Sequence, residues 1–494
     1  MELSLTDQLQ WIADSSSLLT PELIIGAGII ATLLLTIFSV ENSKIYGAVA
    51  VTSVTLSGLA VLFHWHSEPV SLFNHLLRAD DFSSAFKLLF AMGALLTFLM
   101  SLASEKINRP AEYFALLLTA TLGANLLVMS TNFIMVILSL ELISISSYVL
   151  AGFHFTKSGS EGSLKYFLFG SAATAVMIYG ISLLFGLTGT LNFTSSEFVS
   201  QLISLHSPLL VLCGFFILAG FLFKASAAPF HLWAPDVYEA APLPIVAFLS
   251  VVPKLAGIAA LLKFTLAINL FGQSSFDWQS VIAVVALLSI VIGNLSALAQ
   301  KDAKRMMAYS SIAQAGFLIA AIVPLSLQSM HFLIFYSAVF LVMNFVVFII
   351  LQQFEINFKT TEIHALSGLG KIALLPSVIL TIGLIALTGL PPTAGFTAKL
   401  FIFSSLWQAC AETGKSTLIA LLIIGLLNTV ISLFFYLKIP FYLFIRDNTA
   451  KGHTPAKFFT LTNLLGLALV ITLLVLFFYP ALLMSWANRI NFVL

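Results

Sequence analysis

The chain has very few charged residues for its length. Of its 494 residues only 9% are Asp, Glu, Lys or Arg, whereas a soluble domain carries about 25%. Hydrophobic residues make up 60% of the chain, and the mean hydropathy is +1.05. These values exclude a soluble globular protein and indicate an integral membrane protein. The formal net charge of +1 gives no support for nucleic-acid binding.

Cysteine is nearly absent. Cys213 and Cys410 lie far apart in apolar segments. Two such residues do not supply the roughly four ligands of an iron–sulfur cluster or a structural zinc site. The sequence also lacks a haem, flavin or dinucleotide motif, and no polar stretch is long enough for a soluble catalytic domain. We therefore expect no cofactor and no metal in this chain.

Long apolar runs dominate the sequence. Windows of about 20 apolar residues predict fourteen transmembrane helices, at about 22–40, 45–63, 82–103, 112–129, 132–152, 163–186, 208–234, 243–266, 278–299, 303–323, 330–352, 374–409, 416–438 and 459–482. Residues 208–239 and 374–409 are too long for one straight helix, and prolines interrupt both. Proline removes a backbone donor, so we expect helices 7 and 12 to be discontinuous, as in inverted-repeat transporters.

A weak internal repeat relates two parts of the chain. Residues 163–169 (SLKYFLF) resemble residues 329–335 (SMHFLIF). The match defines two five-helix units, helices 4–8 and 9–13, and an odd helix number gives them opposite orientations. We therefore expect an all-α membrane fold with helices 1–3 in residues 1–110, a first repeat in 111–268, a second, inverted repeat in 269–440 and helix 14 in 441–494.

Basic residues gather in every second connection. The connections after odd-numbered helices carry Lys44, Lys106, Arg109, Lys157, Lys301, Lys304, Arg305, Lys359, Lys371, Lys438, Arg446, Lys451 and Lys457, and those after even-numbered helices offer little beyond Arg78 and Lys415. The positive-inside rule then places the odd connections in the cytoplasm and both termini outside.

Glu141 is a carboxylate near the middle of an otherwise apolar span. Counted from Asn132 at about 1.5 Å per residue, it lies roughly 13 Å deep in a bilayer core of about 30 Å. An ionisable group at that depth costs several kcal/mol unless it faces a partner or water. Glu141 is therefore a candidate functional residue, although a buried acid that only holds two helices together is the structural alternative.

Three lysines are equally deep. Lys224, Lys254 and Lys399 each lie about ten or more residues from the ends of their predicted helices, too deep for an ammonium to reach the interface easily. Desolvation disfavours a charged amine, whereas a nearby carboxylate favours it. A Glu141–Lys224 pair is thus expected to switch between charged and neutral forms with small changes in distance, unless the lysines merely neutralise neighbours.

Further candidates lie nearer the predicted helix ends. Lys165 and Lys263 are within reach of the interface, so snorkelling competes with a relay role. His231 follows the proline break and His331 occupies the Lys165 place in the second repeat, but a lone histidine is more often a satisfied polar group. Other polar groups near the surfaces are Asp236 and Glu239, expected as solvated helix-end acids or an intake funnel, and Lys87, expected at the interface.

Several motifs together suggest a family. Residues 224–242 (KASAAPFHLWAPDVYEAAP) closely resemble the helix-7 motif of the antiporter-like membrane subunits of respiratory complex I, with wording most similar to subunit N. Residues 304–312 (KRMMAYSSI), 389–392 (GLPP) and 395–399 (GFTAK) match as well. The resemblance covers essentially the whole chain. It implies that Glu141, Lys224, Lys254 and Lys399 are the family's relay residues, with Lys165 and His231 on the same hydrophilic axis; His331 is added from the repeat alone.

The resemblance implies a proton-translocating subunit of NADH:quinone oxidoreductase in the bacterial cytoplasmic membrane. NADH, FMN, iron–sulfur clusters and quinone are then expected in partner subunits. The expected partners are the M-like and K-like neighbours, the L, A, J and H subunits, the peripheral arm, membrane lipid and protons. The alternatives are a subunit of a multi-subunit Na⁺/H⁺ antiporter, a structural membrane scaffold, and a ferredoxin-coupled or hydrogenase-type relative.

Overall fold

The computed structural model describes residues 15–38, 42–65, 68–104, 107–204, 207–269, 276–446 and 460–492, and these are almost entirely helical. Within them, 12 helices are long and apolar enough to cross a membrane, and α2 (Thr20–Leu34) and α16 (Leu374–Thr388) are shorter apolar helices. The chain is a multi-pass membrane protein. The predicted all-α membrane fold is confirmed.

Each predicted apolar window contains a helix. The remaining elements are α3 (Ser43–Phe63), β1 (Val70–Leu72), β2 (Leu77–Ala79), α4 (Asp81–Leu102), α5 (Pro110–Met129), α6 (Phe133–Ala151), α7 (Lys157–Thr188), α8 (Ser196–Ser204), α9 (Pro208–Ala225), α10 (Ala234–Ala240), α11 (Leu243–Asn269), α12 (Trp278–Leu298), α13 (Ala303–Ile322), α14 (Leu327–Phe358), η1 (His364–Leu366), α15 (Leu369–Ile372), α17 (Ala394–Thr413), α18 (Ser416–Phe444), α19 (Leu461–Phe478) and α20 (Ala481–Ala487).

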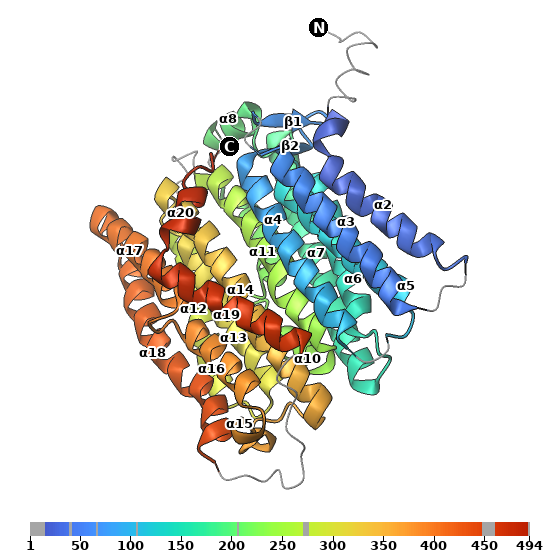
Figure 1. The fold of residues 1–494 in the computed structure, drawn as a ribbon. Helices are drawn as coiled ribbons and strands as arrows, with labels where there is room; N and C mark the ends of the chain where they lie inside the picture. Colours follow the sequence, from blue (N-terminus) through green and yellow to red (C-terminus); the bar gives the residue numbers. More distant parts are fainter. Residues whose placement is uncertain are drawn as a thin grey trace.

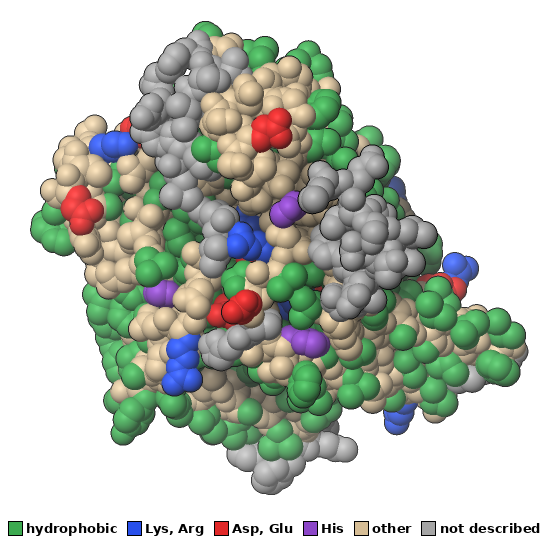
Figure 2. Space-filling view, turned by 90° about the horizontal axis from the view of Figure 1, so that it is seen from above, with side chains coloured by type: hydrophobic (Ala, Val, Ile, Leu, Met, Phe, Trp, Pro, Cys, Tyr) green, Lys and Arg blue, Asp and Glu red, His purple; other side chains and the backbone are tan. Residues whose placement is uncertain are grey.

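The helices run side by side between two ends of the bundle (Figure 1). One end carries α10 and α15 together with the α6–α7 turn; we call it the α10 end. The opposite end carries α8, α20 and the antiparallel hairpin of β1 and β2, and we call it the β1 end. In the view onto the β1 end, charged side chains are few and scattered (Figure 2). Lys106, Lys451 and Lys457, expected near the α10 end, lie outside the described residues.

The most buried helices form the centre of the bundle. The apolar window of α11 is 100% buried, that of α14 94% and that of α13 89%, whereas those of α19 and α7 are 28% and 33% buried. A helix that is apolar on all sides and fully enclosed belongs to a protein core, while one with an exposed apolar surface faces lipid or a neighbouring subunit. Polar residues on α11 and α13 are therefore held away from lipid.

Two chain breaks divide the long apolar segments, as the prolines predict. In the first, α9 ends at Ala225 and α10 begins at Ala234; the backbone N–H of Ala228 donates to Ser289 Oγ at 2.9 Å, and Trp233 Nε1 donates to the Phe223 carbonyl at 3.3 Å. In the second, α16 ends at Thr388 and α17 begins at Ala394. Non-helical backbone at membrane depth requires such protein partners.

Some local features differ from the expectations. The helices α7 and α14 extend beyond the apolar windows at 163–186 and 330–352; at the α10 end, residues 353–358, among them the polar Gln353 and Glu355, continue the α14 helix. The β1–β2 hairpin was not predicted, since its strands are only three residues long. Lys87 is not interfacial: it is 4% exposed and paired with a buried carboxylate.

Candidate functional site

Glu141 and Lys224 lie on α6 and α9. Glu141 is in the middle of α6, and Lys224 is the next-to-last residue of α9, directly before the break. Lys224 is 2% exposed, and its Nζ donates to Ser144 Oγ at 2.9 Å. Ser144 is about one turn from Glu141, which acts electrostatically on Lys224. The direct partner of Lys224 is thus a hydroxyl, and Glu141 itself is half-buried.

Lys254 is fully buried in the middle of the chain. It lies on α11 with 0% exposure, and its Nζ donates to the Ser311 carbonyl at 2.7 Å and to Ser311 Oγ at 2.6 Å. The Tyr238 hydroxyl of α10 lies 3.2 Å from the same Ser311 Oγ. Three elements, α10, α11 and α13, therefore meet at one hydroxyl group, and that group connects Lys254 to the next residues of α13.

A group of polar side chains continues from Ser311 toward α14, α16 and α18. The adjacent Ser310 Oγ lies 2.5 Å from the Tyr436 hydroxyl on α18. Gln314 Nε2 donates to that hydroxyl at 3.2 Å and to the Leu387 carbonyl at 2.9 Å. The Tyr336 hydroxyl donates to Gln314 Oε1. All of these side chains are buried, and each polar contact lowers the cost of holding the others away from water.

Lys399 lies at the far side of this network. It is on α17, 3% exposed, and its Nζ donates to the carbonyls of Leu387 and Thr388 at 3.1 and 2.8 Å. These carbonyls are at the end of α16, where the helix break leaves them without intrahelical donors. The amine also lies 4.5 Å from the centre of the Phe317 ring. Because Gln314 and Lys399 share the Leu387 carbonyl, hydrogen bonds and one peptide link connect Lys254 to Lys399.

The structure does not bring three other candidates into this line. Lys165 has a 41% exposed side chain and pairs with Glu161 and Asp236 at the α10 end. His331 is buried near the β1 end, where its Nε2 lies 3.3 Å from the Ile490 carbonyl. His231 is 7% exposed in the first break, and its Nδ1 has no hydrogen-bond partner. His231 therefore keeps a free polar atom inside the protein.

The acids after the first break are ion-paired. Asp236 binds Lys165 at 2.8 Å and Arg305 at 3.0 Å, and Arg305 also binds Glu239 at 2.6 Å. Partial burial raises the pKa of Asp236, but the hydrogen bonds and charges of Lys165 and Arg305 outweigh it, so that pKa lies below its ordinary value. Asp236 and Glu239 hold α7, α10 and α13 together at the α10 end.

Sequence reasoning missed several buried polar groups. Glu22 of α2 and Lys87 of α4 form an ion pair at 2.8 Å, with both side chains 5% exposed. Gln314, Tyr336 and Tyr436 were also not singled out, although an amide in the middle of the predicted span 303–323 was a usable signal. Within the described residues no cluster of His, Cys, Asp or Glu has the arrangement of a metal site.

Comparisons with known proteins identify the family. Residues 130–432 match the family described as NADH:quinone oxidoreductase/Mrp antiporter, TM. The chain is 36% identical over 480 residues to NADH-quinone oxidoreductase subunit N 2 of Chloroherpeton thalassium, covering 94% of this chain and 93% of the relative. The chain belongs to the subunit N family of NADH-quinone oxidoreductases. This confirms the family resemblance drawn from the motifs.

Solved structures agree with this subunit N assignment. The fold matches a chain of respiratory complex I from Thermus thermophilus with a TM-score of 0.79 and 29% identity, covering 95% of this chain and 100% of that one. An Mrp complex chain from Dietzia matches with a TM-score of 0.82 but only 18% identity, over 96% of both chains, so it shows the shared fold alone. The comparisons favour complex I over the Na⁺/H⁺ antiporter alternative.

A second group of relatives has a different printed name. The chain is 37% identical over 414 residues to NAD(P)H-quinone oxidoreductase subunit 2 of Nostoc, covering 82% of this chain and 77% of the relative.

Proposed function

We propose that this chain translocates protons as a membrane subunit of NADH:quinone oxidoreductase, with Glu141, Lys224, Lys254 and Lys399 as the groups that bind and release them. The observation that carries the proposal is the buried polar connection from Lys254 through Ser311, Ser310, Tyr436 and Gln314 to Lys399. Amines without a paired carboxylate are costly at this depth. Their retention in a hydrogen-bonded row supports proton transfer rather than a structural role.

The proposed transfer couples charge at one lysine to charge at the next. A proton on Lys224 is stabilised by Glu141, and movement of α6 relative to α9 weakens that stabilisation with distance. The proton is then favoured on Lys254 and afterwards on Lys399. The hydroxyls of Ser311, Ser310 and Tyr436 accept and donate protons on the way, and water completes the steps at which a carbonyl or an amide intervenes. His231, Lys165 and His331 stay as peripheral candidates at the two ends.

Electron transfer is proposed to belong to other subunits. NADH, FMN, the iron–sulfur clusters and quinone are assigned to partners, and the conformational change that shifts Glu141 comes from neighbouring membrane subunits. The M-like and K-like neighbours, the L, A, J and H subunits and the peripheral arm remain the proposed partners. Exposed apolar side chains on α2, α3 and α18, such as Leu34, Phe63 and Phe434, supply surfaces for lipid or those neighbours.

The orientation in the membrane is proposed from loop charge. Lys44, Arg109, Lys301, Arg305 and Lys371 all belong to connections of the α10 end, so the positive-inside rule assigns that end to the cytoplasm. The β1 end, with both termini, then faces the periplasm of the bacterial cytoplasmic membrane.

The division into two inverted repeats is also part of the proposal. The broken helices α9–α10 and α16–α17 occupy corresponding places in residues 111–268 and 269–440. Lys165 and His331, which are equivalent by the repeat, lie at opposite ends of the bundle. Opposite ends are what an inverted repeat requires, and residues 1–110 and 441–494 then flank the two repeats.

Replacement of the most central lysine tests the function. Lys254→Met keeps the side-chain volume but removes the amine, so NADH-driven proton translocation in membrane vesicles should be abolished while the complex still assembles. Lys301→Met, at an exposed lysine of the α10 end, should translocate protons normally. Unimpaired translocation by assembled Lys254→Met would refute the proposed relay. Sodium-dependent exchange in vesicles without NADH would instead favour the antiporter alternative.

A further inference from the structure

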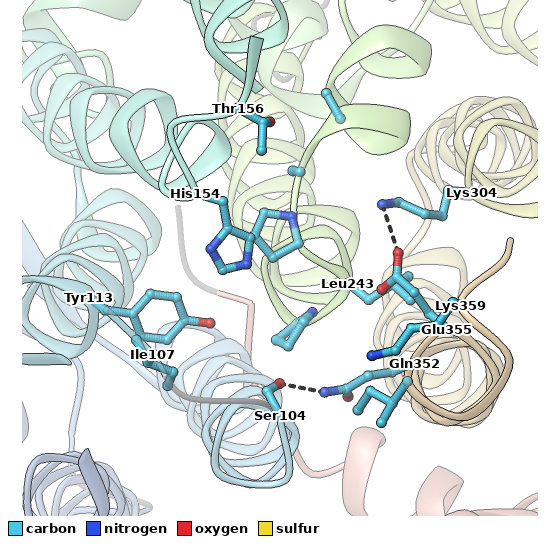
Figure 3. A pocket seen from close by; sticks show the side chains of 15 residues that line it. Ser104, Ile107, Tyr113, His154, Thr156, Leu243, Lys304, Gln352, Glu355 and Lys359 are labelled. Carbon is cyan, nitrogen blue, oxygen red and sulfur yellow. Dashed lines mark hydrogen bonds and ion pairs between the residues drawn. The ribbon is translucent and has the colours of Figure 1, made fainter. Parts of the chain in front are cut away.

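A polar cavity opens among the helix ends at the α10 end of the bundle. Its volume is about 480 Å³, and it lies between the ends of α4, α5, α11, α13 and α14 and the α6–α7 turn. We call it the helix-end cavity. Figure 3 shows that side chains from all of these elements point toward the same space, including Tyr113, His154, Lys304, Gln352 and Glu355. None of these residues was a candidate from the sequence.

The lining is titratable and already hydrogen-bonded at its edges. Lys304 and Glu355 form an ion pair at 3.5 Å, with the Glu355 side chain 39% exposed and that of Lys304 8% exposed. Gln352 Nε2 donates to Ser104 Oγ at 2.6 Å. Partial burial lowers the pKa of His154, Glu355 raises it and Lys304 lowers it, and the pKa lies below the ordinary value. The cavity wall therefore combines an imidazole, a carboxylate and an ammonium group.

The inner side of the cavity points along two helices toward Lys254. Leu243 of α11 and Lys304 of α13 line the cavity. Residues separated by seven or eleven positions return to the same face of an α-helix. Ser311 therefore lies above Lys304 on α13 by about 10 Å, and Lys254 lies above Leu243 on α11 by about 16 Å. Lys254 and Ser311 are the two residues that hydrogen-bond each other.

Small side chains occupy the space between the cavity and Lys254. The same α11 face carries Ala247 and Ser250, and the same α13 face carries Ala308, all 0% exposed. The Ser250 hydroxyl is a polar group on the way, and it donates to the Ala247 carbonyl. At these positions the two helix faces between the cavity and Lys254 therefore carry no large apolar side chain.

The other acidic residues at this end, Asp236 and Glu239, already form ion pairs. Asp236 and Glu239 are bound by Lys165 and Arg305, so their oxygens are occupied by cations. An ion-paired cluster that joins three helices is a poor acceptor for an incoming proton, because protonation breaks the pairs. In the helix-end cavity Glu355 makes a single, longer ion pair, with Lys304 at 3.5 Å, whereas Asp236 makes two at 2.8 and 3.0 Å.

We propose that the helix-end cavity is the mouth through which protons from the α10-end aqueous phase reach Lys254, with Glu355 and His154 as their first acceptors. This inference rests on the proposed proton translocation and specifies where the proton is taken up. It places proton uptake on the side of the bundle that leads to Lys254, between the N-terminal helices and the two repeats. Uptake at the Asp236–Glu239 cluster is the alternative that it replaces.

Two adjacent cysteine variants on α14 test the proposal. Ile356 lines the cavity, whereas the next residue, Asn357, is exposed and does not line it. Ile356→Cys and Asn357→Cys are each assembled into the whole complex and treated with a bulky, membrane-impermeant maleimide on inverted vesicles, whose outer face is the cytoplasmic one. The native Cys213 and Cys410 are buried, and unmutated vesicles treated in the same way control for them.

The expected result is a severalfold loss of NADH-driven proton translocation on labelling Ile356→Cys, with none on labelling Asn357→Cys. A fully labelled Ile356→Cys complex that translocates protons at its unlabelled rate would overturn the proposal. So would labelling of Ile356→Cys from the opposite side of the membrane only. If this variant is unaffected while Lys254→Met is inactive, only the mouth is wrong; if Lys254→Met is also active, the relay itself is wrong.

Two conservative substitutions test the same proposal without maleimide labelling. Glu355→Gln keeps the side-chain volume and removes the exchangeable carboxylate, so it should slow proton translocation severalfold. Glu362→Gln, at an exposed glutamate of the same end, should leave the rate unchanged. Equal rates for Glu355→Gln and the unmutated complex would remove Glu355 as an acceptor and count against the mouth.

Discussion

Tyr436→Phe is the smallest change that separates the two halves of the buried network. The Tyr436 hydroxyl is the group that contacts both Ser310, at 2.5 Å, and Gln314, at 3.2 Å. The phenylalanine ring keeps the packing of α18 but has no oxygen. Space for a water molecule is about 30 Å³, more than one hydroxyl leaves behind, so water does not restore the lost connection. We expect proton translocation to fail.

The expected loss of stability is small, whereas the expected loss of proton-transfer rate is large. Hydrogen bonds between membrane helices contribute about 0.6 kcal/mol each on average, and the largest measured about 1.7 kcal/mol. Loss of the contacts to Ser310 and Gln314 thus costs about 1–2 kcal/mol of stability by that measure. A positioned proton-transfer group contributes about 10²–10⁴-fold to a rate. The complex should therefore assemble, while proton translocation falls by about 100-fold.

The assay compares NADH-driven proton translocation with the amount of assembled complex in vesicles. The matched control is Tyr442→Phe, on the same helix α18 but beside His364 rather than in the network. The control should behave like the unmutated protein. Normal translocation by assembled Tyr436→Phe would refute the view that protons pass between Lys254 and Lys399 by way of this hydroxyl.

Three further outcomes follow from other parts of the structure. Glu22→Gln leaves the Lys87 amine buried without its partner and should destabilise the complex by about 3–5 kcal/mol, whereas the double variant with Lys87→Met should recover most of the thermal stability. Gly389→Ala forces a side chain onto φ +86° with its Cβ 2.7 Å from a buried lysine side chain, and should reduce assembly more than Gly414→Ala, where the space is open. Asp236→Asn should lower thermal stability at pH 7 by at most about 1 kcal/mol; since the folded pKa of Asp236 is depressed, this difference should disappear as the pH falls below the usual carboxyl value of 3.8.

The sequence was sufficient for the fold and for the buried lysines because both depend on one simple property, the contrast between apolar spans and rare charges. Lys254 is fully enclosed, and the proline-containing segments are broken where proline removes a donor. The depth of a residue in the membrane follows from the number of residues that separate it from the end of its helix. Counting along the chain is therefore enough to identify Lys224, Lys254 and Lys399 as buried.

The direction in which a side chain points was not readable in the same way. Lys87 lies two turns inside its helix and was expected at the interface, but α2 and α4 both pack against α3 and α5, and this packing brings Glu22 to Lys87. Gln314 and Tyr436 become partners only because α13 and α18 meet across the bundle. Contacts between helices that are distant in the sequence depend on how the helices pack. The spacing of residues along the chain does not predict these contacts.

The amide of Gln314 has a consequence for the timing of transfer. Its nitrogen donates to Tyr436 and its oxygen accepts from Tyr336, so the Tyr436 hydroxyl accepts from the amide while it also hydrogen-bonds Ser310. An amide holds its hydrogens through resonance and does not exchange them as a hydroxyl or an amine does. In the proposed relay this amide interrupts the direct hydrogen-bonded path between Lys254 and Lys399, so a proton passes only when the Gln314 side chain turns aside or water enters beside it. Under that proposal the resting arrangement disfavours leakage back across the membrane, and each forward transfer needs a motion that the rest of the complex supplies.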